Sequence, residues 1–239
     1  MINKGFTIGV LGGMGTYATI NLFQQYAEIF PAEKEWERPR IIIDNRCTMP
    51  SRVRAFLYEE NVDKLISEMV DSIEHLINAG GNMVRILLAC NTSHLFLPHI
   101  YQRIPYAEKY IVNIINMSAE YLCSLGCSQV RLLGTEATID SGVYQNKLRS
   151  LGIDCISPNT DLYACIRACM EAVKTNRYND EIKHVFLNLL SGKIPVLLGC
   201  TELPILYKKY ENEVKDIAVF DPLRLGLEKI REDFLRCER

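Results

Sequence analysis

Short apolar runs alternate with longer stretches of helical periodicity along the whole of this 239-residue chain. That alternation is typical of βαβ units and predicts an α/β fold whose strands are mostly parallel. With 48% hydrophobic and 23% charged residues, the composition excludes a collagen-like or disordered chain. The apolar runs predict strands at residues 8–11, 41–43, 84–88, 111–115, 130–133, 195–198 and 217–220.

The clearest predicted helix lies between the second and third strands. Between residues 62 and 77 its apolar side chains recur at steps of three and four, with charged side chains on the opposite face. We expect this helix to end at the glycines 80–81. A last helix is expected at about 223–235, after the pair Asp221-Pro222, which suits an N-cap and a first turn.

Two short sequences of the first half recur in the second half. The segment TIGVLGG is echoed by QVRLLGT, and ILLACNTSH is echoed by VLLGCTELP. We therefore expect two similar doubly wound parallel-sheet halves, one formed by residues 1–115 with 218–239 and the other by residues 116–217. Ligands of doubly wound folds bind beyond the carboxyl ends of the strands, so we expect the active site in the cleft between the halves.

The net charge of the chain indicates which kinds of binding partner to expect. Its 27 Lys and Arg against 29 Asp and Glu give a formal net charge of -2, so there is no electrostatic reason to expect binding to nucleic acid or to an anionic membrane. A small molecule is the expected partner. No apolar stretch approaches the roughly 18 residues of a transmembrane helix, and the start of the chain lacks the apolar length of a signal peptide.

The cysteines predict a reduced protein. There are nine of them, an odd number scattered along the chain, so we expect mostly buried free thiols and a cytoplasmic location. The pairs Cys123/Cys127 and Cys165/Cys169 are spaced for one helix face and not for the Cys-x2-Cys knuckle of a zinc site. No metal site is expected.

A glycine-rich turn follows the first predicted strand. The sequence from Gly13 to Ala18 fits the G-x-G-x-x-G/A pattern, and Asp44 ends the next predicted strand. Such a turn points backbone N–H groups at an anion, which suits a pyrophosphate or a carboxylate, although a strand-to-helix turn alone also explains the glycines. A non-catalytic nucleotide- or amino-acid-binding regulator therefore stays open as an alternative.

Two cysteines carry the strongest chemical signal, because each directly follows a predicted buried strand and precedes a helical segment. They begin the sequences Cys90-Asn91-Thr92 and Cys200-Thr201-Glu202. N–H groups at a helix N-terminus favour a thiolate. Two thiols that face one cleft form a two-base pair, in which one removes a proton from carbon and the other returns a proton to the opposite face without a cofactor. The alternative interpretation is a pair of core cysteines.

His94 is a competing candidate for the base. It lies four residues after Cys90, and a Cys–His pair is a nucleophilic arrangement. Because that pair leaves Cys200 unexplained, we expect His94 to be a helix or supporting residue.

Together these segments resemble the aspartate/glutamate racemase superfamily, specifically the pyridoxal-phosphate-independent aspartate racemases. The resemblance implies two similar α/β halves with the active site between them, catalytic thiols at Cys90 and Cys200, no cofactor and a homodimer. The matching sequences, in the family's order, are IGVLGGMGTYAT, ACNTSH, LLGTEATIDSGVYQNKL, LLGCTELP and FDP.

The resemblance also implies residues that bind the substrate. Arg52 stands where the family has an Arg soon after a Pro, although Ser51 replaces the usual Asp and Arg54 is a neighbouring candidate. An arginine there suits bidentate binding of a carboxylate. Lys174 aligns with a substrate-binding Lys of the family. Hydrogen bonds to the substrate are expected from Asn91, Thr92, Thr138 and Thr201.

These observations favour a cofactor-independent racemase that interconverts L- and D-aspartate, with glutamate as the second choice of substrate. A decarboxylase or a cis/trans isomerase of the same superfamily is the alternative enzyme. The presence of both thiols favours racemisation, because a one-sided proton transfer needs only one of them.

Overall fold

The computed structural model describes residues 5–214 and 217–237. Residues 1–4, the start of the segment in which no signal peptide is expected, lie outside the described residues. The chain forms two compact units. Unit 1 consists of Met1–Ile114 and Leu223–Arg239, and unit 2 of Ile115–Pro222. The boundaries between the units therefore fall after residues 114 and 222. The sequence predicted boundaries after residues 115 and 217.

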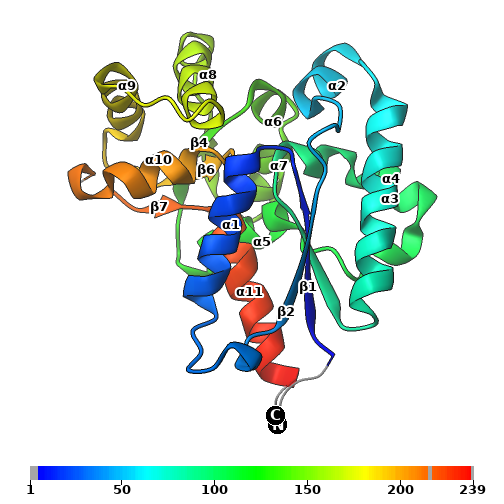
Figure 1. Cartoon of the computed structure of the whole chain (residues 1–239). Coiled ribbons are helices and arrows are strands. Elements are labelled where there is room, and N and C mark those ends of the chain that lie inside the picture. The colour runs from blue at the N-terminus through cyan, green and yellow to red at the C-terminus, as the bar shows by residue number, and fades with distance from the viewer. Residues whose placement is uncertain (1–4, 215–216, 238–239) are drawn as a thin grey trace. The chain divides into compact units, whose positions relative to one another are not determined.

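Unit 1 is built on a parallel sheet of three strands in the order β2-β1-β3 (Figure 1). Because Leu11 pairs with both Asp44 and Leu88, the loops that follow the three strands emerge at one edge of the sheet. The strands are β1 (Thr7–Gly12), β2 (Arg40–Asn45) and β3 (Val84–Leu88). The α-helices are α1 (Thr16–Ile29), α2 (Arg52–Tyr58), α3 (Val62–Gly80), α4 (Leu97–Arg103) and α11 (Pro222–Cys237), with 3-10 helices η1 (Glu35–Glu37), η2 (Thr92–Phe96) and η3 (Pro105–Ala107).

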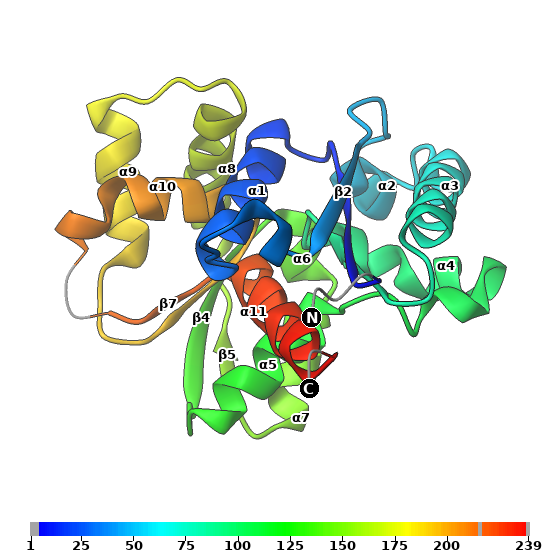
Figure 2. The same ribbon diagram turned by 60° about the horizontal axis from the view of Figure 1, so that its bottom comes forward.

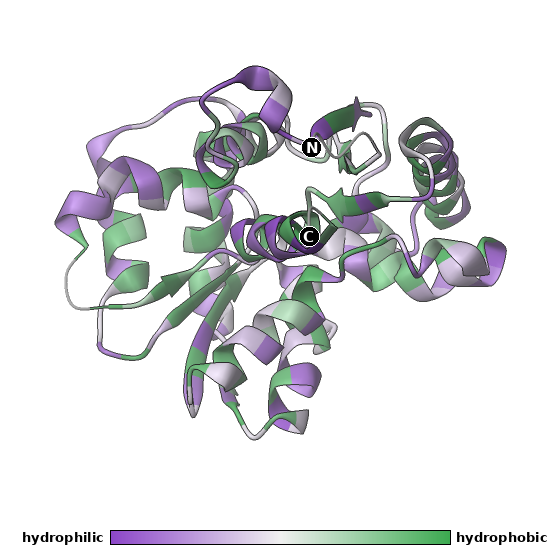
Figure 3. Cartoon of the chain, turned by 90° about the horizontal axis from the view of Figure 1, so that it is seen from below, coloured by the Kyte–Doolittle hydropathy of each residue, from purple (hydrophilic) through white to green (hydrophobic). Residues whose placement is uncertain are grey.

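Helix α3 anchors one face of this sheet, as its periodicity predicts. Its buried residues include Leu65, Met69 and Ile73, which share one core cluster with Ile86 and Leu88 of β3. Burying each such side chain contributes about 1.5–3 kcal/mol. The alternation of hydrophobic and hydrophilic segments along α3 is visible in Figure 3. The helix ends at Gly80, as expected.

Helix α11 covers the opposite face. A Cβ placed on its Gly226 would lie 2.8 Å from the side chain of Leu87, which points away from the α3 side of β3. Figure 1 accordingly shows α1 and α11 on one side of β1 and α3 on the other. Unit 1 is therefore doubly wound, with helices on both faces of a parallel sheet.

Unit 2 repeats this plan on a parallel sheet in the order β5-β4-β6-β7. Helices α8, α9 and α10 share a core cluster with Leu133, Val196 and Leu198, while α5 and α7 lie on the other face (Figure 2). The strands are β4 (Gln129–Gly134), β5 (Asp154–Ile156), β6 (Val196–Gly199) and β7 (Val219–Phe220). The helices are α5 (Ile114–Ser124), α6 (Glu136–Asp140), α7 (Val143–Ser150), α8 (Thr160–Lys174), α9 (Asp180–Leu190) and α10 (Leu203–Tyr210), with the 3-10 helix η4 (Glu211–Glu213).

The strand predicted at residues 111–115 is wrong. Ile111 makes a single parallel bridge to Ile86, and α5 begins at Ile114. The strand β5 was not predicted, because its three residues contain no apolar run. None of the described helices combines the length and apolar character needed to cross a membrane.

Candidate active site

The glycine-rich turn between β1 and α1 is explained by close backbone packing. Gly13 has φ +80°, and a Cβ there would lie 2.3 Å from the carbonyl carbon of Arg46. The N–H of Gly13 donates to Thr19 Oγ1 at 3.2 Å, so it already has an acceptor within the protein. This geometry supports the interpretation of the glycines as parts of a tight strand-to-helix turn.

Asp44, the carboxylate expected to bind ribose in a dinucleotide site, is also engaged. It accepts hydrogen bonds from Ser72 Oγ at 2.6 Å and Arg46 Nε at 2.7 Å. Burial by itself raises the pKa of Asp44, but these two hydrogen bonds together with the charges of Arg46 and His75 outweigh that effect, and the pKa is lowered. Asp44 is thus an ionised structural residue, and the turn and Asp44 together do not form a dinucleotide site.

Cys90 lies just beyond the carboxyl end of β3. It is partly exposed and follows Ala89, whose N–H donates to Leu11 O at 2.9 Å and so holds the loop to β1. The segment after it turns at once into the 3-10 helix η2, where Ser93 Oγ donates to Cys90 O at 2.6 Å. Asn91 and Thr92 are buried beside it. The loop therefore presents one thiol at the sheet edge on a closely bonded backbone.

His94 supports this loop and does not pair with the Cys90 thiol. Its Nδ1 lies 3.1 Å from the backbone oxygen of Cys90, so Nδ1 carries the proton and donates. Burial lowers the pKa of His94 to about 4, although the backbone oxygens of Cys90, Asn91 and Val112 act in the opposite direction. A neutral imidazole that is bonded to the backbone is a structural residue, as expected for His94.

Arg52 begins α2 and braces two loops of unit 1. Its guanidinium donates to Met14 O at 2.9 Å and to Pro50 O at 2.8 Å, which ties the start of α2 to the glycine-rich turn. Helix α2 in turn packs against η2, so Arg52 and Cys90 belong to one cluster of loops. The other candidate, Arg54, is exposed and forms an ion pair with Glu60 at 2.6 Å.

Cys200 occupies the corresponding place in unit 2, directly after β6. Its side chain is buried, and its Sγ donates to Glu202 Oε2 at 2.8 Å. Glu202 is itself only 4% exposed, so this is a thiol–carboxylate bond in a desolvated environment. A buried carboxylate in hydrogen-bond contact with a thiol can accept its proton and generate the thiolate, the reactive form of cysteine.

Three more of the predicted residues of unit 2 gather near Cys200. Lys174, the last residue of α8, donates to Glu171 Oε1 at 2.8 Å. Burial alone lowers the pKa of Lys174, but that hydrogen bond and the charges of Glu202, Glu171 and Cys200 outweigh it and raise the pKa.

The threonines complete this cluster. Thr201 is buried beside Cys200, and Thr138 lies in α6 next to the paired strand ends Gly134 and Gly199. The Thr138 N–H donates to Thr135 Oγ1 at 3.1 Å, and Thr135 Oγ1 donates to Thr138 Oγ1 at 2.9 Å. Each unit therefore carries one candidate thiol with hydroxyl groups and a cationic residue nearby.

Two other cysteines of unit 2, Cys155 and Cys169, have raised pKa values. Burial raises the pKa of Cys155 to about 11 and that of Cys169 to about 12, so both are neutral thiols that pack as apolar side chains. All nine cysteines, which lie within the described ranges, are free. Residues 5–214 and 217–237 contain no group of three His, Cys, Asp or Glu side chains placed to hold a metal ion.

Comparison with known proteins places the chain in a family. The profile of the Asp/Glu/Hydantoin racemase family matches residues 11–230. The chain belongs to the Asp/Glu/Hydantoin racemase family. The Picrophilus torridus aspartate racemase has a similar structure, with a TM-score of 0.77 and 25% sequence identity over 96% of this chain and 94% of that one.

Two curated relatives of this racemase family are similar in sequence. The glutamate racemase of Aquifex aeolicus (strain VF5) is 26% identical over 156 residues, which cover 64% of this chain. The broad specificity amino-acid racemase RacX of Bacillus subtilis (strain 168) is 23% identical over 215 residues, or 87% of this chain and 90% of that protein. The chain spans 59% of the length of the Aquifex aeolicus enzyme and 53% of that of the Aquifex pyrophilus glutamate racemase.

Glu202 is the residue of this site that sequence reasoning missed. The only signal for it was its place two residues after Cys200, which does not distinguish a side chain that turns back to the sulfur from one that faces solvent. The structure shows that it turns back.

Proposed function

We propose that this protein is a cofactor-independent racemase that interconverts L- and D-aspartate, with glutamate as the second substrate, through Cys90 and Cys200. The observation that carries the proposal is the matched placement of the two thiols. Each follows the carboxyl end of a buried parallel strand in its own doubly wound unit. Membership of the racemase family supports the class of reaction.

The proposed step needs no co-reactant. One thiolate removes the Cα proton, which leaves its bonding electron pair on the substrate as a carbanion, and the other thiol delivers its own proton to the opposite face of that carbon. The products are the opposite enantiomer and a pair in which thiol and thiolate have exchanged roles. The enzyme is then ready for the reverse reaction without any net gain or loss of protons.

Glu202 prepares Cys200 for this step. Because Cys200 Sγ donates to Glu202 Oε2 at 2.8 Å, the carboxylate is positioned to take the thiol proton when Cys200 has to act as the base. Glu202 then keeps that proton while Cys90 and Cys200 exchange the roles of acid and base, so the number of protons on the enzyme is the same before and after each turnover.

We assign binding of the substrate carboxylates to the cationic residues and the hydrogen-bond donors that lie near the two thiols. The main barrier to removing a Cα proton is the high energy of a carbanion next to a carboxylate. Positive charge and preorganised hydrogen-bond donors lower that energy. In this proposal Arg52 and Lys174 supply the charge. The donors of hydrogen bonds are Asn91, Thr92, Thr138 and Thr201.

Aspartate is preferred over glutamate because of how the relatives align. The structure of the Picrophilus torridus aspartate racemase is similar to this chain with a TM-score of 0.77 and is covered to 94% of its length, whereas that of the Aquifex pyrophilus glutamate racemase is similar with a TM-score of 0.60 and is covered to 84%. One methylene group is worth about 1–3 kcal/mol in a pocket, so we expect a preference of about tenfold to two-hundredfold.

Replacement of each thiol tests the proposal. Cys90→Ala and Cys200→Ala should each lower the rate of racemisation by about 10²–10⁴-fold, measured by chiral chromatography with either enantiomer of aspartate. Cys123→Ala is the matched control because Cys123 is an exposed thiol outside both clusters. Near wild-type racemisation by either variant, with an unchanged circular dichroism spectrum, contradicts the two-thiol mechanism.

We also propose that the protein is a homodimer in the cytoplasm. The free state of all nine cysteines, all within the described part of the chain, suits a reducing compartment. Light scattering coupled to size-exclusion chromatography should give twice the 27.3 kDa of one chain. A mass of one chain at micromolar concentration contradicts the dimer and leaves the proposed reaction unaffected.

A further inference from the structure

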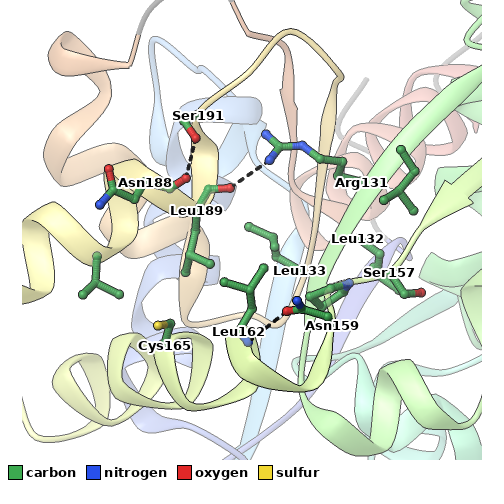
Figure 4. A pocket seen from close by; sticks show the side chains of 13 residues that line it. Arg131, Leu132, Leu133, Ser157, Asn159, Leu162, Cys165, Asn188, Leu189 and Ser191 are labelled. Atoms are coloured by element: carbon green, nitrogen blue, oxygen red, sulfur yellow. Dashed lines mark hydrogen bonds between the residues drawn. The ribbon is translucent and has the colours of Figure 1, made fainter.

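Unit 2 contains a cavity that the proposed reaction does not use. It has a volume of about 610 Å³ and is lined by residues of β4, α8 and α9 and of the segment after β5. Leu133, Leu162, Cys165, Val185 and Leu189 form its apolar walls (Figure 4). Protein cavities that bind small ligands measure about 300–1,000 Å³, with mostly apolar walls and few polar groups. The size and lining of this cavity are those of a small-molecule site.

Arg131 of β4 is the cationic group of the cavity. Its guanidinium donates to Leu189 O at 3.3 Å, as Figure 4 shows, and to Leu190 O at 3.2 Å, at the end of α9. No carboxylate of the described residues pairs with it, and its buried Nε has no hydrogen-bond partner among them. Burial lowers the pKa of Arg131. Such a cation is incompletely compensated by two carbonyl groups, and a bound anion would stabilise it.

The apolar wall of the cavity includes a side chain that is accessible to solvent. Leu162, near the start of α8, lines the cavity and is 39% exposed. A ligand that covers this side chain would remove apolar surface from water. The walls therefore favour a hydrocarbon or aromatic body, and the single cation favours one negative charge.

We propose that this cavity binds a small monocarboxylate with an apolar body, whose carboxylate pairs with Arg131 and whose body packs against Leu133, Leu162 and Leu189. The proposed site lies wholly within unit 2 and does not include Cys200, Glu202 or Lys174. It stands independently of the racemase proposal, because its test does not depend on racemase activity.

Cys165 provides a readout inside the cavity. Cys165 is partly exposed and lines the cavity, so a bound ligand should slow its alkylation by iodoacetamide in the intact protein, measured afterwards by peptide mass spectrometry. The probe is 4-phenylbutanoate, and 4-phenylbutanamide is its uncharged counterpart. At ten times the dissociation constant, 4-phenylbutanoate should slow alkylation of Cys165 about tenfold, with Cys90 and Cys123 unchanged.

Two substitutions separate the charge from the apolar wall. Arg131→Gln should raise the dissociation constant of 4-phenylbutanoate about tenfold or more, to that of the amide, because a charge-assisted pair is lost. Leu162→Trp should occupy part of the cavity and weaken the binding of both probes. Leu125→Trp is the matched control, since Leu125 is 55% exposed in unit 2 and does not line the cavity.

The outcomes are distinct. Protection of Cys165 by the acid, weaker binding of the amide and loss of binding in Leu162→Trp but not in Leu125→Trp support the site, even where Arg131→Gln fails to fold. Equal binding of acid and amide, unchanged alkylation of Cys165 at millimolar probe, or protection confined to Cys90 overturns it.

Discussion

Glu202 is the residue whose removal should change the chemistry with the least change in shape. Glu202→Gln keeps the size of the side chain but removes the carboxylate that accepts the Cys200 thiol proton at 2.8 Å. We expect kcat for aspartate racemisation to fall about 10²-fold or more, and the remaining activity to increase with pH because hydroxide then has to remove that proton.

The control for this experiment is Glu213→Gln. Glu213 pairs with Lys183 at the surface, and such pairs contribute about 0–1 kcal/mol, so its loss should leave the pH profile of kcat unchanged. A Glu202→Gln enzyme with the wild-type rate and pH profile would show that the Cys200–Glu202 bond is only structural.

His94 gives the protein a pH-dependent stability that does not involve catalysis. Its pKa is about 4 in the folded protein against about 6.5 in the unfolded chain, so between these values the unfolded state binds more protons and stability falls as the pH falls. The contribution of the neutral His94 to the free energy of unfolding is fully present above about pH 6.5 and is lost as the pH falls towards 4. We expect this residue to account for a loss of about 2 kcal/mol between pH 7.5 and pH 5.

Urea denaturation of wild type and His94→Gln at both pH values measures this difference. The variant should lose less stability than wild type on acidification, by about 2 kcal/mol. His99→Gln, which replaces an exposed histidine on α4, should behave like wild type. An identical pH dependence in His94→Gln and wild type would rule out a buried neutral His94.

At the scale of elements, the turn from β1 to α1 depends on Gly13. A Cβ there would lie 2.3 Å from the backbone of Arg46, and the residue has φ +80°. Gly13→Ala should therefore destabilise the protein by about 3 kcal/mol or more, since backbone atoms have to move as well as the dihedral angle.

Gly81→Ala provides the comparison for this turn. Gly81 also has a positive φ, +72°, with ψ −164°, but a Cβ there meets nothing within 4 Å, so only the dihedral cost of about 1–3 kcal/mol applies. Guanidinium unfolding of the two variants should show the larger loss for Gly13→Ala. Equal losses would mean that the approach of Arg46 to the turn does not constrain it.

The elements that the sequence predicted are those with a clear period or a buried run. Helix α3 carries a full apolar face, and β3 is a continuous apolar run, so both were predicted within a few residues. The run at 111–115 was ambiguous: its buried residues continue as Ile114, Ile115, Ala119 and Leu122, which is a helical spacing. The strand β5 lies at the sheet edge, where pairing with β4 alone orders three residues without an apolar signal.

At the scale of the whole molecule, repeated motifs predicted two α/β halves, and the structure shows two doubly wound units with separate cores. The positions of Cys90 and Cys200 at strand ends followed from the apolar runs before them. The Cys200–Glu202 bond, the bracing role of Arg52 and the cavity at Arg131 did not, because each depends on side-chain directions and long-range packing that one-dimensional patterns do not contain.

The most direct test of the two-thiol racemase is the fate of the Cα proton in D2O. The reduced, folded protein is incubated with L-aspartate, and ¹H NMR with chiral chromatography follows both enantiomers during the first few per cent of conversion. We predict that D-aspartate appears with deuterium at Cα while the remaining L-aspartate keeps its proton, because separate thiols remove and deliver protons on opposite faces. Absence of D-aspartate, or deuterium entering L-aspartate as fast as D-aspartate forms, would contradict it.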